Sequence, residues 1–210
     1  MPSFWRQRLA LAAGLFAFAA VAGAQTFTDS FATASHWSAA SPPPWGGNHT
    51  GGLAFTNGRL EFTSTATGVA FTSRTLTSWR APVASDWSVQ VDAHLDNGEI
   101  WGNLGGVAWR LLSMVVYRGA TLEPRFGVTF EREQTDNSNS FYAFGAANGT
   151  GFDLPAVNVN TADAARRLTY SASVRSLTAW YDPDGATGGY NWISLGTVYI
   201  GASAPPGARQ

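Results

Sequence analysis

The sequence predicts an all-β protein, a two-sheet antiparallel sandwich. The stretch Leu168–Gly185, LTYSASVRSLTAWYDPDG, alternates apolar and polar side chains on both sides of a tight joint at Val174–Ser176. Such period-2 alternation is typical of strands with one buried and one wetter face. Elsewhere, short alternating stretches are separated by turns that draw on the chain's 23 glycines. No segment keeps an apolar period of 3.6 residues over several turns, so helices are not expected to build the core.

The first half of the chain contains four predicted strands. Proline and glycine are frequent in Ser35–Thr56, so this segment is expected to be a loop. Asn57-Gly58 is a strong turn signal. Alternation in DWSVQVDAHL places Trp87 and Ala93 on the same face of their strand. The four predicted strands are Thr26–Phe31, Arg59–Thr63, Val69–Thr75 and Asp86–Leu95.

The second half contains the predicted core. Gly105–Arg118 is apolar on both faces, which predicts a central strand that is covered above and below. In Arg125–Glu133, the alternating apolar residues from Phe126 to Phe130 are expected to point inward. Gly149–Ala164 is expected to be mostly loop, and Thr161–Arg166 is the only predicted helix, a short one. The remaining predicted strands are Phe141–Ala147, the pair within Leu168–Tyr181, and Tyr190–Ile200.

Both ends are expected to lie outside the folded domain. Arg6 and Arg8 precede the apolar run Leu9–Val21, and Ala22-Gly23-Ala24 forms a small-residue cleavage site. These features predict a secretory signal peptide at residues 1–24, because the apolar run is shorter than the roughly 20 residues that span a bilayer. Residues 25–201 are then the sandwich domain, and residues 202–210 a disordered tail. The expected location is secreted, extracellular or periplasmic, with no membrane insertion after signal cleavage.

Charge and composition narrow the range of partners. The formal net charge is −1 and no basic patch is evident, so nucleic acid is not expected to bind. The chain has no cysteine, which excludes a disulfide framework, a zinc–thiolate site and a thiol nucleophile. The three histidines do not have metal-ligand spacing, and neither a serine-hydrolase elbow nor a nucleotide-binding glycine loop is present.

Three motifs occur in a recognisable order. They are an opening F-x-D-x-F with a following Trp37, the central NGRLEF of Asn57–Phe62, and the late LTYSASVRSLTAWYDPDG. This order resembles the concanavalin A-like lectin and glucanase superfamily, in its uncharacterised exported bacterial type. The resemblance covers most of residues 27–200 and implies a jelly roll. Members of this type usually carry further strands after the counterpart of Tyr190–Ile200, which implies that this chain is shortened at its C-terminus.

Two carboxylates on one strand suggest a catalytic role. Glycoside hydrolysis uses two carboxyl groups about 5–9 Å apart, and residues i and i+2 of a strand lie about 6–7 Å apart on one face. Glu131 and Glu133 satisfy this spacing, and a bulge would add Asp136. The pattern loosely resembles the E-x-D-x-x-E strand of laminarinase-type glycosidases, although here the middle residue is Glu and the last is Asp. The alternative, which we favour, is a solvated face at a strand end.

Asp182 and Asp184 precede Gly185 and suggest calcium as a possible cofactor, because clustered carboxylates bind this ion. Asp-Pro-Asp-Gly is equally typical of a type I turn. Two side chains do not fill the six to eight oxygen positions that calcium prefers. The turn is therefore the preferred interpretation, and no other cofactor is expected.

Aromatic residues in polar loops are the strongest candidates for a carbohydrate-binding site. Sugar rings stack their C–H faces on exposed aromatic rings, while neighbouring polar side chains bond the hydroxyls. Trp180 and Tyr190 flank the late turn, near Asn191 and Trp192. Trp87 and Trp109 are instead expected in the core. The first candidates for sugar contacts are Trp101, Asp96, Asn97, Asn103 and Trp45.

The sequence therefore favours an exported, lectin-like carbohydrate-binding domain without catalytic activity, whose partner is a glycan or a cell-surface polysaccharide. Two alternatives remain open. One is a glycoside hydrolase that acts on a β-glucan-type polysaccharide through Glu131 and Glu133. The other is a structural protein of the cell surface or extracellular matrix that binds no small ligand.

Overall fold

The computed structural model describes residues 28–39, 52–56, 59–63, 73–77, 79–95, 109–117, 125–133, 139–147 and 150–200. These residues form eleven strands and no helix, so the all-β prediction is confirmed for this part of the chain. Within the same ranges there is no helix of the length and apolar character needed to cross a membrane. The predicted signal peptide at residues 1–24 and the predicted tail at 202–210 lie outside the described residues.

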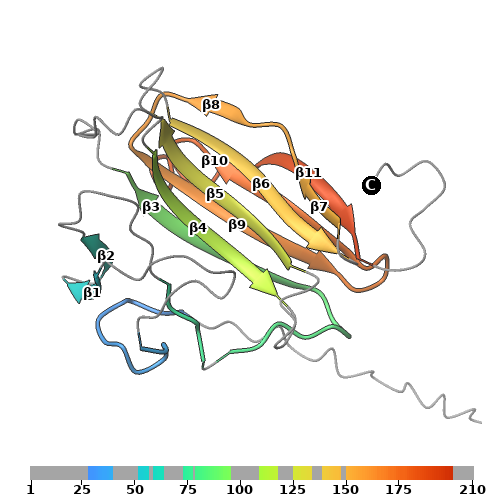
Figure 1. Ribbon diagram of the computed structural model, residues 1–210, viewed down its shortest axis with the longest axis horizontal. Helices are drawn as coiled ribbons and strands as arrows, with labels where there is room; N and C mark the ends of the chain where they lie inside the picture. Colours follow the sequence, from blue (N-terminus) through green and yellow to red (C-terminus); the bar gives the residue numbers. More distant parts are fainter. Residues whose placement is uncertain are drawn as a thin grey trace, which may run out of the picture.

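The strands form two larger antiparallel sheets and one separate hairpin (Figure 1). The four-stranded sheet has the order β11-β10-β9-β3, and the five-stranded sheet has the order β4-β5-β6-β7, with β8 also paired to β6. The separate hairpin consists of β1 (Gly52–Thr56) and β2 (Arg59–Thr63). The strands of the four-stranded sheet are β3 (Trp87–His94), β9 (Asp163–Ser171), β10 (Ser176–Asp182) and β11 (Ile193–Tyr199). The strands of the five-stranded sheet are β4 (Trp109–Tyr117), β5 (Arg125–Glu133), β6 (Asn139–Ala147), β7 (Thr150–Asp153) and β8 (Val157–Val159).

The two larger sheets pack face to face around one hydrophobic core. In Figure 1, which looks down the shortest axis, their strands lie one behind the other. Phe130 and Phe141 stack within the five-stranded sheet at 4.7 Å between ring centroids, and Phe141 stacks on Tyr181 of β10 at 5.1 Å. Leu168 and Ala179 from the four-stranded sheet belong to the same buried cluster. The architecture is therefore sandwich-like, with the inward residues of both sheets interdigitated.

Strict alternation correctly predicted three parts of this core. In β3, residues from Trp87 to His94 alternate between half-buried and exposed. In β5, Phe126, Val128 and Phe130 are fully buried, as expected for inward residues. The β9–β10 hairpin follows the predicted faces and closes at Arg175, whose φ of 51° suits a tight turn. Burial of one face of each strand is what fixes their register.

Several predictions about the segments between these strands were wrong. Thr161–Arg166 is not a helix, because β9 begins at Asp163 and pairs with β3 from its first residues. Ala164 and Ala165 are buried in that pairing, so tertiary contact outweighs their helix propensity. Gly149–Ala164 also contains the strands β7 and β8 rather than mostly loop. The last strand begins at Ile193 and not at Tyr190.

The N-terminal segment also differs from its prediction. Residues 28–31 do not form a strand, because the Asp29 carboxylate accepts the backbone N–H of Phe31 at 2.7 Å and turns the chain. The predicted loop Ser35–Thr56 ends in strand β1. Of the predicted strand Val69–Thr75, residues 69–72 lie outside the described part, and Arg74 and Thr75 belong to no strand.

The described part of the predicted central strand Gly105–Arg118 is β4, which pairs with β5 and comes first in the described order of its sheet, so its central position stays a prediction. Leu112, Met114 and Val116 pack against the core from its inner face. The apolar residue Val115 lies on the opposite, outer face of β4, away from this core. A Cβ on Gly127 would lie 3.0 Å from Val115 and 2.8 Å from the Phe144 ring, so Val115 belongs to a small apolar contact on the outer face.

Candidate functional site

The residues first proposed for sugar binding lie outside the described part of the chain. This set comprises Trp101, Asp96, Asn97, Asn103 and Trp45. Asp136 lies outside it as well, and of Glu133 only the backbone is described, in β5. These residues therefore stay predictions, and the candidate site is built from the residues whose side chains are described.

Glu131 is the one described member of the predicted carboxylate pair. It lies on the outer face of β5, where its Oε1 accepts a hydrogen bond from the Ser140 hydroxyl at 3.0 Å. On the same face, Tyr142 of β6 stands opposite Thr129. Burial and the nearby Glu131 charge raise the pKa of the Tyr142 hydroxyl. Glu131 is thus placed in a hydrogen-bonded cross-strand pair.

Asp182 and Asp184 shape the turn that follows β10. Asp182 is fully buried, and its carboxylate accepts the backbone N–H groups of Asp184, at 3.2 Å, and of Asn191. A hydrogen bond between the two side chains raises the pKa of Asp184, which lies at the surface. No cluster of three or more possible metal ligands occurs among the described residues. This geometry supports the turn interpretation, in which Asp182 orders the backbone leading to β11.

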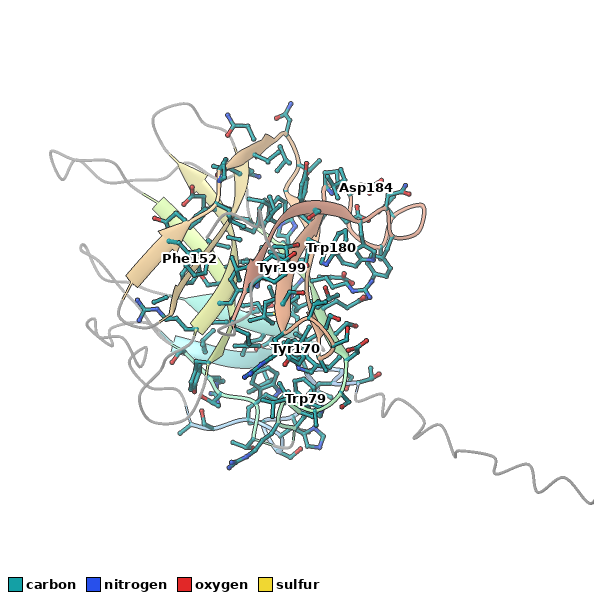
Figure 2. The ribbon with its side chains drawn as sticks, turned by 90° about the vertical axis from the view of Figure 1, so that its right-hand side faces the viewer. Trp79, Phe152, Tyr170, Trp180, Asp184 and Tyr199 are labelled. Carbon is teal, nitrogen blue, oxygen red and sulfur yellow. The ribbon has the colours of Figure 1, made fainter. Side chains whose placement is uncertain are left out.

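The same turn carries a group of three aromatic side chains, which we call the aromatic platform: Trp180, Tyr190 and Trp192. The rings of Tyr190 and Trp192 stack with centroids 5.2 Å apart and planes 13° apart. Trp180 lies on the outer face of β10 and donates from its indole nitrogen to the Thr169 hydroxyl at 2.9 Å. Figure 2 shows Trp180 and Asp184 toward the same end of the molecule, away from Tyr170 and Trp79. The platform thus belongs to the outer face and one end of the four-stranded sheet.

Two charged side chains contact the aromatic platform from neighbouring strands. The Tyr190 hydroxyl donates to the Asp92 carboxylate of β3, at 3.0 and 3.1 Å from its two oxygens. The Arg167 guanidinium of β9 lies 5.6 Å from the centroid of the Trp192 ring, within the range of a cation–π contact. Arg167 is also the cross-strand partner of Trp180. Partial burial and the Asp92 carboxylate raise the pKa of the Tyr190 hydroxyl, which keeps it protonated and donating.

The platform remains accessible to a ligand. Tyr190 is 40% exposed even though it is stacked and hydrogen-bonded, and Trp180 and Trp192 are partly buried. A surface aromatic pair held on both sides by polar contacts loses little side-chain freedom when a ligand arrives, so binding costs less entropy. Chemically, it offers a flat apolar ring with a carboxylate and a guanidinium close by.

Sequence reasoning named the aromatic residues around this turn but missed Asp92 and Arg167. The alternation within β3 does place Asp92 on its wetter face. The pattern does not reveal that β3 pairs with β9, a pairing between residues more than 60 positions apart in the chain. Only that pairing brings Asp92 and Arg167 to the same aromatic turn.

No protein family model, no curated protein and no solved structure matches this chain significantly. Its function is therefore argued from the site itself.

Proposed function

We propose that this protein is an exported, non-catalytic carbohydrate-binding domain, built on a concanavalin A-like jelly roll, and that the aromatic platform is its sugar-binding surface. One observation carries the proposal: a partly exposed Tyr190 ring is stacked on Trp192, with Asp92 and Arg167 in contact with the pair. The sandwich-like arrangement of the sheets supports the fold part of the proposal, since loops and sheet faces of such scaffolds commonly carry binding sites.

The chemistry of the platform matches the surface of a sugar. A pyranose ring presents apolar C–H groups on its faces and hydroxyl groups around its edge. An aromatic ring packs against the apolar face, and a small number of polar groups at the rim fix the orientation of the ligand. Here Tyr190 provides the exposed ring, and the Asp92 carboxylate provides an acceptor group at its edge, while Arg167 holds the neighbouring Trp192 ring.

The experiment is a pull-down of the purified protein with a panel of insoluble and immobilised polysaccharides, followed by titration of the polymers that bind. Replacing Tyr190 by Ala, and separately Trp192 by Ala, is expected to weaken binding at least tenfold, or about 1.4 kcal/mol. The matched control is Tyr117→Ala, which removes a 37% exposed tyrosine from the other sheet and is expected to leave binding unchanged.

Thermal unfolding of each variant separates lost binding from lost folding. Because Tyr190 is largely outside the core, Tyr190→Ala is expected to fold even if Trp192→Ala does not. Wild-type levels of binding by a folded Tyr190→Ala variant would overturn the site, and failure of the wild-type protein to bind any polymer would overturn the function. Release of reducing sugar that disappears in Glu131→Gln would establish the hydrolase alternative instead.

A further inference from the structure

The charges around the aromatic platform are unbalanced. Three carboxyl groups lie at or next to it: Asp92 bonded to Tyr190, Asp182 bonded to the N–H of Asn191, and Asp184, whose backbone N–H bonds Asp182. Arg167 is the one described cation in contact with it. The next outward residue of β3, His94, is paired with Asp163 at 2.7 Å and does not contact the platform's carboxylates in any described interaction.

The single cation is built into the platform instead of being presented to a ligand. Its guanidinium lies against the Trp192 ring, and its Nε is buried without a hydrogen-bond partner among the described residues. Arg167 is also not within ion-pair distance of Asp92 or of any other described carboxylate. Its charge therefore stabilises the Trp192 ring, while Asp92 and Asp184 are exposed to solvent.

The two carboxylates give the surface a preference among sugars. A sugar hydroxyl can donate to an ionised carboxylate, and such charge-assisted hydrogen bonds are about twice as strong as neutral ones. A sugar that carries its own carboxylate or sulfate brings like charges together instead, and this repulsion is weakly screened at low salt.

We propose that the platform binds neutral polysaccharides and rejects polymers that carry a carboxylate or sulfate on the sugar ring. This inference rests on the proposed function, because it specifies the ligand class of the same surface. It also gives Asp184 a role that the turn alone does not require, since Asp182 provides the acceptors that order the backbone.

The test compares one polymer in two chemical forms. A neutral glucan or mannan that the wild-type protein binds is oxidised selectively at its C6 hydroxyls to carboxylates, and a second portion is sulfated. At low ionic strength, both anionic forms are expected to bind at least about tenfold more weakly than the parent polymer. Because screening shortens the range of the repulsion, the difference is expected to shrink in roughly 0.5 M salt.

Variants that each remove one negative charge test whether this surface causes the preference for the neutral polymer. Asp184→Asn is expected to reduce the difference between neutral and oxidised polymer to about threefold or less, without weakening binding of the neutral polymer by as much as Tyr190→Ala does. The matched control, Asp153→Asn, removes an exposed carboxylate from β7 of the other sheet and is expected to leave the ratio unchanged.

The outcomes separate this inference from the proposed function. Equal or tighter binding of the oxidised polymer, lost in Tyr190→Ala, would overturn the charge preference and leave the sugar-binding surface intact. A preference for the neutral polymer that Asp184→Asn and Asp153→Asn change equally would also overturn it, because the selectivity would then follow net charge alone. If neither form binds, both the function and its ligand class are rejected.

Discussion

Arg166 on β9 donates a hydrogen bond from Nη1 across the core to the backbone carbonyl oxygen of Leu112 on β4. The side chain is 7% exposed, its Nε has no hydrogen-bond partner in the described part of the chain, and none of the described carboxylates pairs with it. Burial lowers its pKa from 12.5 to about 10. One strand thus directs two neighbouring arginines to opposite faces, Arg166 into the core and Arg167 to the Trp192 ring of the aromatic platform.

Replacing Arg166 by Met is expected to leave the free energy of unfolding unchanged or to raise it by up to about 2 kcal/mol. Removing the buried charge relieves roughly 3 kcal/mol of desolvation, the equivalent of its pKa shift, while the orphaned Leu112 carbonyl costs about 1–3 kcal/mol. Arg166→Ala is expected to be less stable than Arg166→Met by about 2 kcal/mol or more, because it leaves a cavity. Urea unfolding at constant m-value measures both. A loss of more than about 3 kcal/mol in Arg166→Met would reveal an acidic partner.

Asp29 is expected to stabilise the N-terminal segment in a pH-dependent way. Its carboxylate loses some hydration through burial, which by itself raises its pKa, but bonds from the Phe31 N–H, the Trp37 indole and His36 lower the pKa below the ordinary 3.8. Because the folded-state pKa is lowered, this stabilisation is present above about pH 4 and is lost as the pH falls through the folded value.

Replacing Asp29 by Asn is expected to expose Trp37 to water, which shifts the fluorescence of this indole. The variant should also lose the change in Trp37 fluorescence that acid causes in the wild-type protein. The loss is about 1–3 kcal/mol of local stability. Asp86→Asn is the control, since that carboxylate bonds the Ala172 N–H of the β9–β10 turn and not the N-terminal segment. An acid transition of Trp37 that persists unchanged in Asp29→Asn would contradict this assignment.

Gly127→Ala is expected to destabilise the five-stranded sheet by about 1–3 kcal/mol through overpacking. The added methyl would lie 2.8 Å from two atoms of the Phe144 ring. Trimming that ring in Gly127→Ala/Phe144→Leu should recover part of the loss, and a double-mutant cycle on thermal unfolding measures the coupling. At Gly151 of β7 the nearest atom to an added Cβ is 3.8 Å away, so Gly151→Ala is expected to be nearly neutral. Additive effects at Gly127 and Phe144 would argue against the contact.

Asp182→Ala is expected to lower the unfolding temperature by several degrees and to weaken the platform, because two backbone N–H groups lose their buried acceptor. Both oxygens of this carboxylate already accept a backbone N–H, Oδ1 from Asp184 and Oδ2 from Asn191. Addition of millimolar calcium, or of a chelator, is therefore expected to leave the unfolding temperature of the wild-type protein unchanged. A calcium-dependent rise that Asp184→Asn abolishes would restore the metal interpretation of this turn.

The alternation of apolar and polar residues correctly predicted which side chains point toward the core. The inward residues of β3, β5 and the β9–β10 hairpin follow it closely, because each of these strands has one face on the core. It could not predict that Asp29 would turn the chain at the F-x-D-x-F motif, since that depends on side-chain hydrogen bonds to residues up to eight positions away. The partnership of Asp92 with Tyr190 depends on pairing between distant segments, for which a single sequence carries no local signal.

The pairing of the last described strand, β11, with β10 is irregular. Along β10, Ala179 pairs with Gly196 but Trp180 pairs with Ser194, so Leu195 is an extra residue and the ladder shifts there. Gly196 adopts a φ of 148°, and Leu154 packs so close that a Cβ would lie 2.6 Å from it. A strand with such a bulge cannot offer a regular row of backbone groups to a second molecule. We therefore expect the bulge to disfavour intermolecular strand addition along β11, the last strand in the described order of this sheet.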